Sequence, residues 1–250
     1  MKIATRESAI FVVTAALGFA ACAAVTIAWC ASMSSMPGME MPGGWTMSMT
    51  WMRMPGQGWP GAAANFLGMW IVMMIAMMLP ALLPALRRLH PRGGLMLRVA
   101  AGYYAAWLLL GFALFPMGVA LAELAMRHAG LARLVPALSS LVLIVAGALQ
   151  CGAWKSRALA GCRARATCCD APFRDPARAP RHGFKLGLHC LRCCAPWTAA
   201  LLALGVMDLP AMAWVTAAVG AERLLPRGEM LARWSGLALL VCGVLGLTNT

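Results

Sequence analysis

Long apolar runs with few or no charges alternate with short polar or basic segments along the whole chain. The runs cover residues 10–30, 66–86, 99–122, 134–154, 187–207, 209–225 and 234–250. A helix that crosses a bilayer needs about 20 consecutive apolar residues, a length that the first five runs reach. The pattern therefore predicts an all-α fold, a polytopic transmembrane helix bundle of six to seven helices.

The stretch around Asp208 decides between six and seven helices. Asp208 is the only charged residue between positions 193 and 221, and one helix through that whole stretch would be too long for a bilayer. Asp caps a helix start and Pro is tolerated in the first turn, so Asp208 and Pro210 predict a new helix over 209–225. The bundle has seven spanning helices if this helix crosses the bilayer, and six if it lies at the outer surface.

Composition indicates that a bilayer surrounds these helices. Hydrophobic residues make up 62% of the 250 residues and charged residues only 12%, whereas a soluble domain carries roughly 25% charged residues. The net charge is +13, but Lys and Arg lie in short clusters between the apolar runs. That placement is typical of topology signals facing an anionic leaflet, and it argues against nucleic-acid binding.

The basic residues also predict the orientation of the chain. With a cytoplasmic N-terminus, 18 of the 21 Lys and Arg residues fall inside for seven crossings, and 15 for six. Both counts obey the positive-inside rule. We therefore expect a multi-pass protein of a bacterial-type inner membrane. Its parts are a first transmembrane helix at 1–31, a Met-rich extracytoplasmic loop at 32–64, and a helical membrane domain at 65–250 with a cytoplasmic loop at 155–185. A cleaved signal peptide is the alternative for the first helix, although its apolar run is long for one.

Eight methionines lie between positions 33 and 54, in a segment that has no Leu, Ile or Val. They follow one another mostly as Met-x-Met or Met-x-x-Met: Met33, Met36, Met39, Met41, Met47, Met49, Met52 and Met54. Thioether is a soft, neutral ligand that selects copper(I), and it survives where free cysteine would oxidise. The loop is therefore a candidate capture site for copper(I). The alternative is an apolar loop resting on the membrane surface, since methionine often only fills space.

The second apolar run carries a face of methionines. Met69, Met73 and Met77 recur at i, i+4 and i+8, and Met74 and Met78 form a parallel row. Such a ladder could pass a soft cation across a bilayer without buried carboxylates, which are costly there. A methionine stripe at helical spacing is also ordinary core packing, so ligation competes with packing as its explanation.

The chain has ten cysteines, and the densest cluster opens the run at 187–207. It comprises His189, Cys190, Cys193 and Cys194, which fall within two helical turns, and Cys190 shares a helix face with Cys194. Two or three thiolates could converge there on one ion, with inert packing and thiol–disulfide exchange as the alternatives. Three further cysteines precede it in the basic segment, at a spacing that matches no zinc finger or haem site: Cys162, Cys168 and Cys169.

Two blocks of the sequence resemble the signature of domain of unknown function 2182, a family described as predicted metal-binding integral membrane proteins. The first block reads Trp70-x-x-Met73-x-x-Ala76-Met77-Met78-x-Pro80-x-x-x-Pro84. The second reads Gly187-x-x-Cys190-x-Arg192-Cys193-Cys194, followed by Gly205-Val206-Met207-Asp208 and Glu222. The resemblance implies a membrane protein that binds a metal, and it implies no particular reaction.

The leading hypothesis is a membrane protein that captures, transports or delivers copper(I), with another soft metal as the alternative ion. Its expected partners are the lipid bilayer and a copper enzyme or copper chaperone, and the sequence leaves open whether it forms oligomers. A membrane thiol oxidoreductase using Cys190 with Cys193 or Cys194 is the second hypothesis. The third is a structural or assembly subunit whose sulfur residues only pack. No nucleotide-binding motif is present to drive transport, and no enzymatic activity is expected.

Overall fold

The structure is a computed structural model that describes residues 2–34, 38–53, 56–89, 93–167 and 176–249. Within these ranges the chain forms eight α-helices and one short hairpin. The helices are α1 (Lys2–Ser34), α2 (Trp59–Leu89), α3 (Gly93–Arg127), α4 (Ala129–Cys151), α5 (Ala153–Thr167), α6 (Ala179–Leu204), α7 (Leu209–Leu224) and α8 (Gly228–Thr248). Six of them, all except α5 and α7, are long and apolar enough to cross a membrane. The prediction of an all-α polytopic bundle is confirmed.

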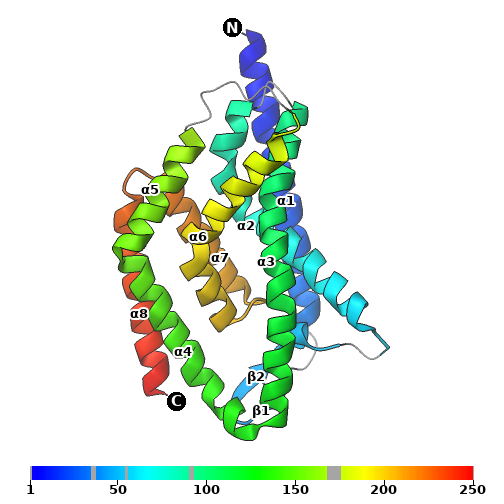
Figure 1. The fold of residues 1–250 in the computed structure, drawn as a ribbon, viewed down its shortest axis with the longest axis vertical. Coiled ribbons are helices and arrows are strands. Elements are labelled where there is room, and N and C mark those ends of the chain that lie inside the picture. The colour runs from blue at the N-terminus through cyan, green and yellow to red at the C-terminus, as the bar shows by residue number, and fades with distance from the viewer. Residues whose placement is uncertain (1, 35–37, 54–55, 90–92, 168–175, 250) are drawn as a thin grey trace.

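The helices form an elongated bundle with two distinct ends (Figure 1). The connection between α3 and α4 lies beside the hairpin at one end, called the hairpin end below, and α5 lies toward the other, called the α5 end. α4 packs mainly along α8, α3 along α6, and α1 along α2. The N-terminus lies at the α5 end and the C-terminus toward the hairpin end.

The α7 helix runs back from the hairpin side toward the α5 end, antiparallel to α6 (Figure 1). Asp208 begins it as predicted, because its side chain accepts a hydrogen bond of 2.8 Å from the backbone N–H of Ala211. α7 has 16 residues, about 24 Å at 1.5 Å per residue, which is short of a full hydrocarbon core. With α7 included, the chain runs along the bundle seven times (Figure 1). Among the described helices, six are long and apolar enough to cross a membrane.

Glycines allow α3 and α6 to approach closely. A Cβ atom at Gly102 of α3 would lie 2.0 Å from the carbonyl oxygen of Pro180, and one at Gly183 of α6 would lie 2.0 Å from that of Val99. Any side chain at either position would therefore collide with the backbone of the opposite helix. Such small residues are what allow helices in a membrane to pack backbone against backbone.

The segment at 155–185, expected to be a loop, is largely helical. α5 occupies its beginning and α6 starts at Ala179, while residues 168–175, including Cys168 and Cys169, lie outside the described part. α5 has no apolar run in its sequence, and polar contacts with other helices hold it in place. Arg163, for example, donates hydrogen bonds to the backbone carbonyls of Glu222 and Leu225.

The methionine-rich loop contains a hairpin that docks on α3 and α4. Strand β1 (Met39–Met41) pairs antiparallel with β2 (Trp45–Met47), and a 3-10 turn (Met49–Trp51) follows. Met41 and Met47 are buried against three alanines of α3 and α4, namely Ala122, Ala125 and Ala132. The indole N–H of Trp45 donates a hydrogen bond of 2.9 Å to the carbonyl of Ala132. The hairpin therefore packs against α3 and α4.

Large apolar side chains cover the outside of the bundle. On α1 and α8 they include Val13, Leu17, Val241 and Leu245, all roughly half exposed or more. A soluble protein would not leave so many such side chains in water, so this surface fits contact with lipid.

Candidate metal centre

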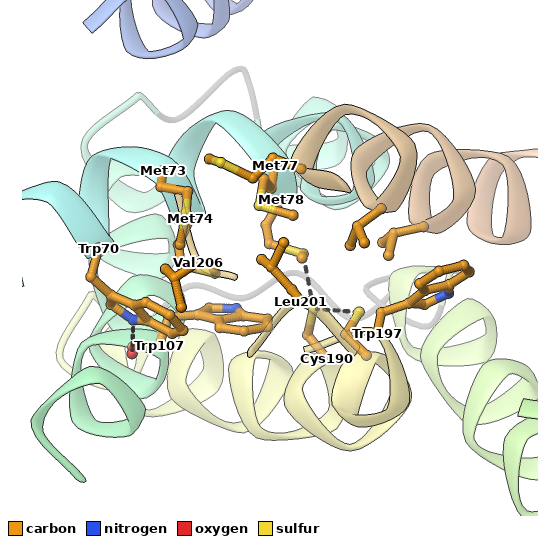
Figure 2. Close-up of a cluster of buried hydrophobic side chains, with 14 of the residues drawn as sticks. Trp70, Met73, Met74, Met77, Met78, Trp107, Cys190, Trp197, Leu201 and Val206 are labelled. Atoms are coloured by element: carbon orange, nitrogen blue, oxygen red, sulfur yellow. Dashed lines mark hydrogen bonds between the residues drawn. The ribbon is translucent and has the colours of Figure 1, made fainter. Parts of the chain in front are cut away.

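The methionine face of α2 points into the core of the bundle. Met69, Met73, Met74, Met77 and Met78 are each at most 4% exposed. Figure 2 shows four of them between α2 and the side chains of α3 and α6. Every predicted ligand on this helix is therefore turned away from the lipid.

Trp70 fixes the rotation of α2 against α3. Its side chain is fully buried, and its indole N–H donates a hydrogen bond of 2.9 Å to the carbonyl of Trp107 (Figure 2). A buried indole N–H without an acceptor would be costly, so this bond favours one orientation of the helix. The adjacent methionine rows are thereby directed toward α6.

Three sulfur atoms meet where α2 passes α6, and they are called the sulfur cluster below: Met78, Cys190 and Cys194. The Sγ atom of Cys190 lies 3.9 Å from Sδ of Met78 and 3.9 Å from Sγ of Cys194 (Figure 2). The hydroxyl of Tyr103 on α3 donates a hydrogen bond of 2.8 Å to the Cys190 sulfur. All four side chains are buried.

The two distances measured from the Cys190 sulfur match those expected around one three-coordinate ion. A thiolate–metal bond is about 2.3 Å long for zinc, so three such bonds at 120° place their sulfurs about 4 Å apart. Among the described residues, no three His, Cys, Asp or Glu side chains are arranged to hold a metal. A three-ligand site at this point therefore needs the Met78 thioether. Such a mixed site of thiolates and thioether suits a soft metal ion better than a hard one such as Mg²⁺ or Ca²⁺.

Cys193 and His189 belong to the same helix and lie at the edge of the sulfur cluster. The Cys193 thiol interacts with Cys162 of α5 as well as with Cys194. The Cys162 sulfur donates to the backbone carbonyl of His189 at 3.2 Å and accepts from the Arg223 guanidinium at 3.4 Å. The His189 side chain lines a cavity outside the sulfur cluster.

The bond to Cys193 and, after it, burial raise the pKa of the Cys162 thiol, against the opposing effect of Arg223. Cys162 is thus held as a thiol next to a permanent cation. The sequence placed it in a basic loop, whereas α5 brings it to the edge of the sulfur cluster.

A buried ion pair lies next to the cysteine turn of α6. Nζ of Lys155 lies 2.7 Å from Oε2 of Glu222, and both side chains are at most 2% exposed. The same ammonium group donates a hydrogen bond of 2.9 Å to the carbonyl of Cys193. The carboxylate also accepts hydrogen bonds from Gln150, from Trp197 at 3.0 Å and from Ser235 at 3.2 Å. One network therefore ties five helices (α4, α5, α6, α7 and α8) to the cysteine turn.

Sequence reasoning missed this pair. The available signal was Glu222 itself, because an acidic residue inside an apolar run needs a partner in a membrane protein. Lys155 directly follows the fourth apolar run, a position typical of a basic topology signal.

A cavity of about 370 Å³ opens beside the sulfur cluster at the α5 end. Tyr103, Cys162, His189 and Arg223 line it, together with apolar residues of α2 and α6. Because Tyr103 lines the cavity and donates to the Cys190 sulfur, the cavity reaches the edge of the buried sulfurs.

The predicted ligands of the methionine loop are not gathered in one place. Met33 and Met52 line a small cavity with Met69. Met41 and Met47 pack in the small core beneath the hairpin, and Met39 is exposed. Met49 lies in the 3-10 turn, while Met36 and Met54 fall outside the described residues. The loop does not fold as one cluster of thioethers in the part that the structure describes.

A sequence model of a protein family described as copper chaperone (PpoB2) matches residues 67–246. The chain belongs to this copper chaperone family. The matched range covers most of the chain, and it contains the methionine face of α2 and the whole sulfur cluster. It excludes the methionine loop at 33–54, so membership in the family rests on the helical bundle. No curated protein and no solved structure matches the chain.

Membership in the copper chaperone family supports the expectation of a copper-related function. The family match names no ligand residues, so candidate ligands have to be identified from the side chains of the bundle.

Proposed function

We propose that the protein is a membrane-embedded copper(I) chaperone whose central binding site is the sulfur cluster. The observation that carries the proposal is the pair of 3.9 Å distances that join Met78, Cys190 and Cys194 in a buried position. A buried site made only of soft sulfur ligands selects a soft monovalent ion over Mg²⁺ or Ca²⁺, which prefer oxygen.

Charge balance also favours copper(I) in this site. Two thiolates around one monovalent cation leave a net charge of −1, which would be costly in a low-dielectric core. The Arg223 guanidinium interacts electrostatically with Cys190 and Cys194, and it compensates this charge. A divalent ion would instead leave the guanidinium beside a neutral site.

The methionine face supplies the route to this site. Met69, Met73 and Met77 are spaced four residues apart on α2, which is about 6 Å along the axis. A copper(I) ion moving along them exchanges one copper–sulfur bond for another at each step. Copper stays in the same oxidation state, so the route needs no electron donor or acceptor.

We further propose the direction and the cellular setting. The protein lies in a bacterial-type inner membrane with its N-terminus in the cytoplasm, because that orientation places most basic residues inside. The hairpin end then faces outward and the α5 end inward. Copper(I) captured outside is passed to a copper enzyme or copper chaperone whose thiol reaches the sulfur cluster through the cavity at the α5 end.

Copper analysis of the purified protein tests the proposal. The intact chain is loaded with copper(I) under reducing conditions, desalted, and compared with a Cys190→Ser/Cys194→Ser variant. Cys242→Ser serves as the matched control, since Cys242 is exposed on α8. We expect the double variant to lose one copper per chain and the control to lose none.

Met78→Leu is the second variant, because it preserves the side-chain volume and removes only the thioether. It is expected to weaken copper binding while leaving the helical circular dichroism unchanged. Equal copper in wild type, Met78→Leu and the double cysteine variant would refute the sulfur cluster as the binding site.

A further inference from the structure

A second group of sulfur side chains meets at the hairpin end, far along the bundle from Cys190. Four methionines from four different segments line one small cavity, and they are called the outer thioether pocket below. They are Met33 at the end of α1, Met52 after the 3-10 turn, Met69 on α2 and Met207 in the turn between α6 and α7. These four methionines come together only through the packing of the helices and the loop, because no single methionine-rich stretch contains them all.

The volume of the pocket limits what it can hold. It measures about 30 Å³, enough for a water molecule or a single ion and too small for an organic ligand. Its other walls combine the apolar side chains of Trp29, Phe66 and Ala62 with the neutral polar side chains of Thr50, Gln57 and Asn65. Among the described residues, no Asp, Glu, Lys or Arg lines the pocket. The pocket therefore offers soft thioether donors beside neutral polar groups, and no carboxylate for a hard divalent cation.

Two contacts hold the thioethers in place. The Cys30 thiol of α1 donates to the Met207 sulfur at 3.6 Å, and Cys30 itself is buried. Trp51, in the 3-10 turn, packs its ring against Phe66 with centroids 5.2 Å apart. Trp29 adds an aromatic wall, and an indole can attract a desolvated cation. These contacts join α1, the hairpin segment, α2 and the α6–α7 turn around one point.

We propose that the outer thioether pocket is a second binding site, distinct from the sulfur cluster, for one soft monovalent cation, copper(I). The identity of the ion in this second site rests on the proposed function. Met69 belongs both to the pocket and to the methionine face of α2, so an ion bound there is already at the start of the row that leads to Met78. Binding forms copper–thioether bonds, displaces water and transfers no electron or proton.

The proposal assigns a ligand role to Met207, which the sequence analysis did not name as a ligand. Met207 stands alone between α6 and α7, and Cys30 is separated from it by 177 positions. It also separates the loop methionines by role. Met33 and Met52 are ligands, whereas Met41 and Met47 stabilise the hairpin by packing.

Competition titrations of the full chain in detergent test the pocket. The Cys190→Ser/Cys194→Ser background removes the sulfur cluster, so the remaining copper(I) is held elsewhere. A copper(I)-specific chelator then reports the affinity of the remaining site. We expect one copper(I) per chain in this background, and we expect Met52→Leu/Met207→Leu to weaken its affinity at least tenfold.

Two controls make the outcome specific. Met230→Leu changes an exposed methionine of α8 and should leave the affinity unchanged. Met41→Leu changes a buried loop methionine outside the pocket and should also have no effect. An affinity that falls equally with Met41→Leu and with Met52→Leu/Met207→Leu would show general loosening of the hairpin end and would overturn the pocket.

The two proposals fail in different ways. If the pocket variants leave copper(I) binding unchanged while the cysteine variants lose copper, the pocket is refuted and the proposed function stands. If the cysteine variants keep all their copper and only the pocket variants lose it, the sulfur cluster is refuted and the pocket stands.

Discussion

The buried pair of Lys155 and Glu222 gives the sharpest test of the packing around the site. Lys155→Met removes the ammonium group that lies 2.7 Å from the carboxylate, and it also removes the donor to the Cys193 carbonyl at 2.9 Å. Both side chains are at most 2% exposed, so water cannot replace the lost partner. Leaving one member of a buried ion pair alone costs about 3–5 kcal/mol.

This cost is large enough to measure by thermal unfolding. For a chain of this size, 1 kcal/mol shifts the melting temperature by about 2–4 °C, so Lys155→Met should lower it by about 6–20 °C. Glu222→Gln should have a similar effect, because it leaves the ammonium group buried without a counter-charge. Circular dichroism of the detergent-solubilised protein during heating provides the measurement.

The double variant distinguishes the ion pair from loss of packing. In Lys155→Met/Glu222→Gln no charge is left unpaired, and the new amide oxygen can still accept hydrogen bonds from Trp197 and Ser235. We expect the double variant to be clearly more stable than the sum of the single effects predicts. Single variants that melt within 2 °C of the wild type, or purely additive effects, would refute the argument.

Three further predictions follow from contacts in the described part of the chain. Tyr103→Phe removes the hydroxyl that donates to the Cys190 sulfur, worth about 1.5–3 kcal/mol if that sulfur is charged. It should weaken copper(I) affinity about tenfold or more in chelator competition, and unchanged affinity would contradict a role for this bond. Asp208→Ala removes the cap of α7 and should cost about 1 kcal/mol in thermal unfolding, whereas Asp208→Asn should be nearly neutral. Gly102→Ala should sharply reduce the yield of folded protein, whereas Gly94→Ala in the same helix, with open space around it, should not; equal yields would contradict the close approach of α3 and α6.

The apolar helices could be predicted from the sequence because the thickness of a bilayer imposes the length of each run. The runs at 66–86, 99–122, 134–154 and 187–207 all lie largely within α2, α3, α4 and α6. The break at Asp208 was also predictable, since Asp and Pro act locally at a helix start. α5 was missed because its polar sequence has no apolar period, and because its stability comes from distant partners such as Glu222.

The candidate site was predictable only in part, for the same reason. Cys190 and Cys194 share a face by helical geometry alone, and their sulfurs lie 3.9 Å apart. Met78 is 112 positions away from Cys190, and Tyr103 is 87 positions away. Their contacts depend on how α2, α3 and α6 pack, which no local pattern encodes. Met207 stands apart from the other methionines in the sequence, so no ligand spacing included it.

X-ray absorption at the copper edge tests the central claim most directly, because it reports which atoms surround the bound ion. The intact protein loaded with one copper(I) per chain should show a first shell of sulfur alone. In Cys190→Ser/Cys194→Ser that spectrum should be lost or replaced by one of thioether ligands. A first shell dominated by nitrogen or oxygen in the wild type, or a spectrum that the two substitutions leave unchanged, would contradict sulfur ligation at Met78, Cys190 and Cys194.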